Sequence, residues 1–169
     1  MTAASARVAS SGFLIGVGLA VYPLLGAGAV RTALAVVGGM GLLLYLFAVG
    51  GLWPGGLGVA VGLLAAEYLA SLYVRGVQLD VTAPIYAACL FVCGELGWLG
   101  VDGGAGSPRW PARWFATAGL ALAGAALGWV LVIVATVPLA GGLVVTALGV
   151  AAALAAATTV AWLARRANE

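Results

Sequence analysis

Six long apolar segments occupy most of this 169-residue chain, and each is long enough to cross a lipid bilayer as a helix. The hydrocarbon core of a bilayer is about 30 Å thick, so a spanning helix needs about 20 mostly apolar residues. Arginines and clusters of proline and glycine separate the segments, which cover residues 9–25, 30–50, 57–74, 83–99, 113–137 and 143–163. We therefore predict an all-α, polytopic integral membrane protein: a six-transmembrane-helix bundle that forms one transmembrane domain over residues 1–169.

The composition excludes an ordinary soluble domain, because 64% of the residues are hydrophobic and only 7% are charged. Soluble domains carry roughly a quarter of charged residues. The chain has no histidine and no lysine, which excludes a haem on a proximal histidine, a histidine-ligated zinc site and a lysine Schiff base. Its two cysteines are too few for an iron–sulfur cluster, and a net charge of +2 is too small for a nucleic-acid partner. We expect no cofactor and no metal site.

The arginines predict the orientation of the chain in the membrane. With six spans, both termini and the second and fourth connections lie on one side. Five arginines fall on that side and two on the other: Arg7, Arg109, Arg113, Arg165 and Arg166 against Arg31 and Arg75. Cytoplasmic loops carry the excess of positive charge, so we expect both termini in the cytoplasm and the protein in the inner (plasma) membrane of the cell. The first segment also resembles a secretory signal peptide ending at Ala27-Gly28-Ala29, but we expect it to be retained as a span.

Aromatic residues follow the same asymmetry. Tryptophans cluster near the predicted cytoplasmic interface, at Trp53, Trp98, Trp110, Trp114 and Trp162. Tyr22, Tyr73 and Tyr86 fall near the opposite interface. Tryptophan and tyrosine commonly anchor spanning helices at the level of the lipid headgroups, and we expect that role here.

Two acidic side chains lie inside the predicted hydrocarbon region, Glu67 and Glu95. A charged carboxylate at the bilayer centre costs about 2.5–3.5 kcal/mol, so we expect each to face the bundle interior and to be hydrogen-bonded, protonated or paired. Tyr68 and Ser71 are the nearest polar neighbours of Glu67 along its helix. Two interpretations stay open: the acids tie helices together, or they form two stops on an ion or proton path.

A short stripe of basic and aromatic residues precedes the fifth segment. Arg109-Trp110 and Arg113-Trp114 recur four residues apart, on one side of a helix. Arginine contacts lipid phosphate and tryptophan anchors at the headgroups, so the stripe predicts contact with lipid or with a cytoplasmic partner. Either arginine is also close enough to the cytoplasmic rim to meet Glu95.

Glycine is abundant, with 27 residues, and three pairs have the G-x-x-x-G spacing: Gly12/Gly16, Gly58/Gly62 and Gly124/Gly128. This spacing lets the backbones of two membrane helices approach closely. The pairs predict either packing within the bundle or a face for another membrane protein.

Enzyme signatures are absent from the sequence. It contains no G-x-S-x-G, H-E-x-x-H or Walker A motif, and the few acids outside the segments do not cluster. We therefore expect that the protein is not an enzyme, and we assign no catalytic residue.

The stretch from Ala66 to Trp98 carries a pattern of its own, which reads Glu67-Tyr68-Leu69-Ala70-Ser71-Leu72, Leu79-Asp80, Ala83-Pro84-Ile85-Tyr86-Ala87-Ala88 and Glu95-Leu96-Gly97-Trp98. It resembles a group of small bacterial membrane proteins encoded beside MoxR-type AAA ATPases and their von Willebrand-type partner proteins. The resemblance covers about a fifth of the chain. It implies a context and no activity: an accessory membrane component near an ATPase-driven chaperone system.

Together these features predict an accessory or scaffold subunit of a bacterial membrane protein complex, linked to an AAA ATPase chaperone system. Its expected partners are the lipid bilayer and other membrane subunits or further copies of itself. The alternative is a small transporter, or an ion or proton conductor, that uses the intramembrane Glu67 and Glu95.

Overall fold

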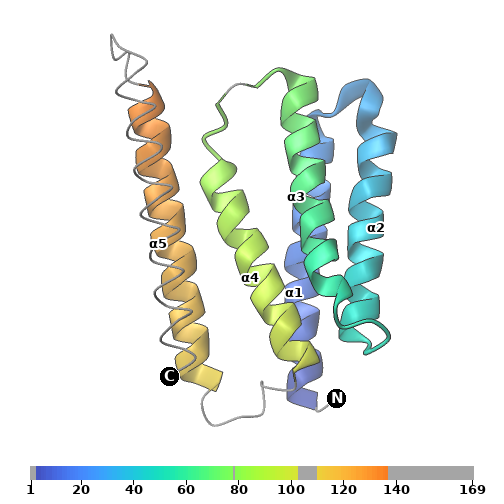
Figure 1. The fold of residues 1–169 in the computed structure, drawn as a ribbon. Coiled ribbons are helices and arrows are strands. Elements are labelled where there is room, and N and C mark those ends of the chain that lie inside the picture. Colours follow the sequence, from blue (N-terminus) through green and yellow to red (C-terminus); the bar gives the residue numbers. More distant parts are fainter. Residues whose placement is uncertain (1–2, 78, 103–109, 137–169) are drawn as a thin grey trace. The chain divides into compact units, whose positions relative to one another are not determined.

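The computed structural model describes residues 3–77, 79–102 and 110–136, and within these ranges every regular element is a helix (Figure 1). The helices are α1 Ala3–Val21, α2 Arg31–Val49, α3 Gly56–Arg75, α4 Ala83–Val101 and α5 Trp110–Thr136. Two 3₁₀ turns, Tyr22–Gly26 and Gly28–Val30, connect α1 to α2. The prediction of an all-helical chain is confirmed over these residues. The predicted sixth segment, 143–163, lies outside them.

Five helices in the described ranges are long and apolar enough to cross a membrane. Their bounds lie within a few residues of the first five predicted segments, apart from the start of α1. That helix begins at Ala3 and not near residue 9. The extension contains alanines, which favour helix even where serine and arginine interrupt the apolar pattern.

Gly76 ends α3 and sets the direction of the chain into the next loop. Its φ of +64° is left-handed, a conformation that glycine adopts without the strain of a side chain. The amide of Gly76 donates to the Tyr73 carbonyl and the amide of Val77 donates to the Leu72 carbonyl, both at 3.1 Å. These two bonds form a Schellman motif, which satisfies carbonyls that the end of the helix would leave unpaired.

The chain divides into two compact units, Met1–Val130 and Leu131–Glu169. Of the second unit, the structure describes only the end of α5, up to Thr136. In the first unit, α1 packs chiefly on α4 and α2 packs chiefly on α3. Each of these helices buries a row of residues spaced by three and four, which keeps the row on one face. The row on α2 consists of Leu34, Gly38, Gly41, Tyr45 and Ala48.

Glycines let these helices approach closely at some places and leave open faces at others. A Cβ atom on Gly12 would overlap the Tyr45 hydroxyl, and one on Gly16 would lie 3.2 Å from Cδ2 of Leu42. This pair therefore serves packing within the bundle. Cβ atoms on Gly58 and Gly62 would meet nothing within 4 Å, so that side of α3 is open.

Candidate functional site

Glu67 lies near the middle of α3, and its side chain is completely buried. It belongs to the buried row of that helix, one turn from Leu64 and one turn from Ser71. On the facing helix α2, the carboxyl group lies against Gly38, where a Cβ atom would overlap Oε2. Among the described residues, neither carboxyl oxygen has a hydrogen-bond partner. The inward orientation predicted for Glu67 is therefore observed. Of the three expected states, hydrogen-bonded, protonated or paired, the described residues provide no hydrogen bond.

A cluster of three tyrosines lies next to Glu67 at the α3–α4 side of the bundle. The rings of Tyr68 and Tyr86 are stacked, with centroids 4.0 Å apart and an interplanar angle of 12°. The Tyr22 ring lies 6.4 Å from Tyr68 and 6.1 Å from Tyr86. Aromatic pairs at these separations stabilise a structure by more than the burial of their apolar surface alone. We call Tyr22, Tyr68 and Tyr86 the tyrosine cluster.

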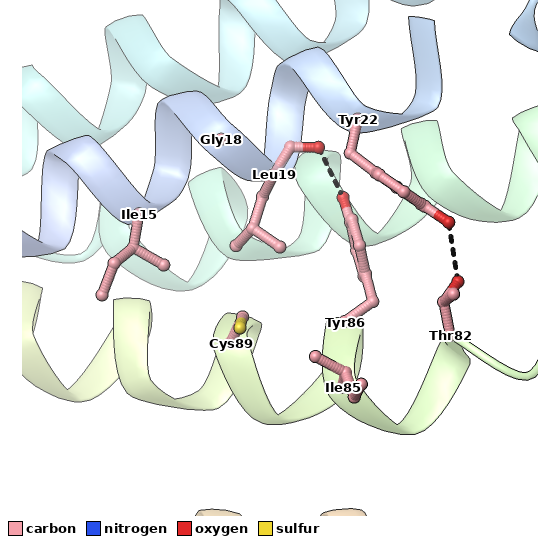
Figure 2. A pocket seen from close by; sticks show the side chains of 8 residues that line it. All are labelled: Ile15, Gly18, Leu19, Tyr22, Thr82, Ile85, Tyr86 and Cys89. Atoms are coloured by element: carbon pink, nitrogen blue, oxygen red, sulfur yellow. Dashed lines mark hydrogen bonds between the residues drawn. The ribbon is translucent and has the colours of Figure 1, made fainter. Parts of the chain in front are cut away.

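Tyr86 is a core residue in this cluster. Its hydroxyl oxygen lies 3.1 Å from the carbonyl oxygens of both Leu19 and Leu64, which share its single proton, and so connects α1, α3 and α4. Figure 2 shows the bond to Leu19. Its side chain is only 5% exposed. The prediction that Tyr86 anchors at the headgroups is therefore wrong, because the carbonyls inside the bundle satisfy its hydroxyl. Tyr73, at 88% exposure, does face outward as that prediction requires.

Asp80 lies beyond the tyrosine cluster, in the connection between α3 and α4. Its carboxylate accepts hydrogen bonds from the Thr82 amide (2.8 Å), the Thr82 hydroxyl (2.6 Å) and the Tyr68 hydroxyl (2.9 Å). The Arg75 guanidinium lies 4.0 Å away. Partial burial by itself would raise the pKa of Asp80, but these hydrogen bonds and the arginine outweigh it and lower the pKa below its usual value.

The side chains of the loop before α4 bond one another and not the start of the helix. Thr82 occupies the N-cap position of α4, but its side chain does not cap the helix. Its hydroxyl instead bonds Asp80 and lies 2.8 Å from the Tyr22 hydroxyl. Ser71 is likewise occupied, since its hydroxyl donates to the Tyr68 carbonyl at 2.7 Å. The polar groups near Tyr68 thus bond one another and leave Glu67 out.

A groove of about 420 Å³ runs between α1 and α4 beside the cluster (Figure 2). Ile15, Gly18, Leu19, Ile85 and Cys89 form most of its wall, and Tyr22 and Thr82 place hydroxyl groups at one end. None of the described residues that line it is charged. The groove therefore suits an apolar chain better than a polar solute.

Glu95 lies apart from Glu67, in the half of α4 that ends at Val101 and so away from the Asp80 end of the bundle. Its Oε2 atom is 3.4 Å from Nη2 of Arg113, and both side chains are partly exposed. This ion pair matches one of the two expected for Glu95; the other arginine, Arg109, lies outside the described residues. The rings of Trp110 and Trp114 lie 6.0 Å apart on α5, beside Arg113.

The structure thus brings Glu67, Tyr68 and Ser71 together in the interior and places Glu95 elsewhere. Sequence reasoning did not assign Gly38, Tyr22, Tyr86, Asp80 or Thr82 to this site, and it named Tyr22 and Tyr86 only as anchors at the interface. Their signal was present in part: Asp80, Thr82 and Tyr86 lie within seven residues of one another. Among the described residues, no three histidine, cysteine, aspartate or glutamate side chains form a possible metal site. Comparison with models of protein families, with curated proteins and with solved structures finds no match for the chain.

Proposed function

We propose that this chain is a multi-pass protein of a bacterial inner membrane, with six spanning helices and both termini in the cytoplasm. Five apolar helices of sufficient length support the location. Helices α1 to α4 alternate in direction along the chain, as spans joined by short connections must (Figure 1). The excess of arginine on the side of the termini supports the orientation.

Reporter fusions test this topology. Fusions after Gly104 and after Glu169 should report the cytoplasm, and a fusion after Val77 should report the opposite side. A reporter active outside the cytoplasm at either of the first two positions would contradict the number of spans or their orientation.

Within the membrane, we propose that the protein is an accessory subunit that binds one transmembrane helix of a partner protein. The binding surface is a groove of about 430 Å³ between α3 and α4, which we call the α3–α4 groove. Gly55, Gly58 and Gly94 line it, and Phe91 and Trp98 form part of its wall. The observation that carries the proposal is that Gly58 of α3 and Gly94 of α4 line the same groove. At Gly58 an added Cβ would meet nothing within 4 Å.

The physical argument concerns what holds helices together in lipid. Lipid tails are as apolar as leucine, so the burial of apolar side chains contributes little to the free energy of association between membrane helices. They associate where small residues allow close packing of backbones, and glycine allows the closest approach. The α3–α4 groove offers three glycines to an incoming helix, with exposed aromatic side chains beside them.

The partner that we propose is a membrane protein of an AAA ATPase chaperone system. The resemblance of residues 66–98 to proteins encoded beside MoxR-type ATPases supports this choice. An adjacent ATPase gene would support it further, and a gene that stands alone would count against it.

Co-purification of the partner in mild detergent tests the groove. Gly58→Leu places a large side chain in the groove, and because a Cβ there meets nothing within 4 Å, the variant should fold but lose the partner. Gly39→Leu is the matched control, because a Cβ on Gly39 also meets nothing within 4 Å but lies on α2. Retention of the partner by Gly58→Leu, or a wild-type protein that is monomeric and alone, would contradict the proposal.

A further inference from the structure

The interior of the bundle encloses a carboxyl group without a counter-charge. Glu67 is 0% exposed, and no hydrogen bond from the described residues reaches its oxygens. Removing a carboxylate from water costs several kcal/mol unless a cation or hydrogen-bond donors compensate it. The nearest arginine of α3, Arg75, is already engaged with Ser71 and Asp80.

The described side chains that surround Glu67 offer no positive charge. The buried row of α2 presents glycine at position 38, and its one titratable member is Tyr45, almost two turns away. Helix α4 presents Tyr86 and Cys93, and the Cys93 thiol donates to the Gly12 carbonyl. On α3 itself, the buried titratable neighbour is Tyr68, whose hydroxyl donates to Asp80. Every one of these groups is neutral or bonded elsewhere.

We propose that Glu67 is a proton-binding site in the centre of the bundle, which exchanges its proton through the tyrosine cluster with the Asp80 end. This goes beyond the role of an accessory subunit and does not depend on it. A proton neutralises the carboxylate and needs no shell of ligands. A metal cation would need several oxygen ligands, and among the described residues no group of three histidine, cysteine, aspartate or glutamate side chains could supply them.

The direction of exchange follows from how polar side chains are distributed along α3. Toward Arg75, the next buried residues are Tyr68 and Ser71, and the Tyr68 hydroxyl bonds Asp80 directly. Toward Gly56, the buried residues are Leu64, Ala60 and Leu57. Proton relays within membranes are built from polar side chains, and the apolar residues toward Gly56 offer no group that can carry a proton. The Asp80 end therefore gives access, and the Gly56 end is closed.

Infrared spectroscopy of the purified protein tests the protonation directly. At neutral pH, the wild type should show the carbonyl stretch of a protonated carboxylic acid, which lies apart from the amide bands. Glu67→Gln should lose this band, Glu67→Asp should keep it at a shifted frequency, and Glu95→Gln should leave it unchanged. Absence of the band from the wild type, or its persistence in Glu67→Gln, would overturn the proposal.

Sodium and deuterium test the ligand and the path. Loss of the acid band on addition of sodium at constant pH would show a cation site and overturn the choice of a proton. After transfer to D₂O, the band should shift more slowly in Tyr68→Phe than in the wild type. Tyr73→Phe is the matched control, since Tyr73 is an exposed tyrosine of the same helix. Equal rates in all three proteins would overturn the path through Tyr68.

Discussion

Gly38 and Gly39 are neighbours on α2 that differ only in what they face, and we expect alanine to act differently at the two positions. A Cβ on Gly38 would overlap the carboxyl group of Glu67, with Cδ at 2.7 Å and Oε1 at 2.8 Å. A Cβ on Gly39 would meet nothing within 4 Å. Overpacking a buried site typically costs about 1–3 kcal/mol. We expect the lower part of that range, because the displaced group is the end of a side chain that can rotate.

Comparing the two variants isolates the contact with Glu67. Both replace a helical glycine by alanine, so the gain of up to about 1 kcal/mol in helix propensity is common to them and cancels. The assay is unfolding of both variants by denaturant in the same detergent. We expect Gly38→Ala to be less stable than Gly39→Ala by about 1–2 kcal/mol. In a Glu67→Ala background the difference should disappear, since the overlapping group is gone. Equal stability of the two single variants would refute the placement of Glu67 against α2.

Two further predictions concern the tyrosine cluster and Asp80, which accepts a hydrogen bond from Tyr68. Tyr86→Phe keeps the ring stack but removes the hydroxyl that connects α1, α3 and α4. It should lower the free energy of unfolding, measured by heat or denaturant, by about 0.5–1.5 kcal/mol, whereas Tyr73→Phe should leave it unchanged. Asp80→Asn should lower the free energy of unfolding at neutral pH. Because the pKa of Asp80 in the folded protein lies below its ordinary value of about 3.9, the stabilisation by its carboxylate is complete above that value and is lost as the pH falls through the folded pKa. A wild type that remains more stable than Asp80→Asn in strong acid would contradict the lowered pKa of Asp80.

The helices were the part of the fold that sequence reasoning could predict. Apolar length and the arginine, proline and glycine between segments mark their bounds, because a bilayer sets the length of a span and breakers set its ends. The start of α1 was harder to predict from the sequence, because Ser5 and Arg7 interrupt the apolar pattern without ending the helix.

The neighbours of each helix could not be predicted in the same way. A helix that is apolar on all sides has no periodicity that reveals its inner face, so Tyr86 could equally have faced lipid. Its burial depends on carbonyls of Leu19 and Leu64, which are distant in sequence. Glu67 was easier, because the cost of a charge in lipid by itself predicts an inward orientation. The contact between Glu67 and Gly38 depends on how α2 packs on α3, and the sequence of neither helix predicts that packing.

Photo-crosslinking from the α3–α4 groove tests the central claim, that a partner helix binds there, most directly. A photoreactive aromatic amino acid would replace Phe91, an exposed residue in the wall of the groove, in cells that express the partner. The same substitution at Phe47, an exposed phenylalanine of α2, is the control. The proposal predicts a crosslink from position 91 alone, to a peptide in a transmembrane helix of the partner. A crosslink only to lipid, or only to a second copy of this chain, would contradict it.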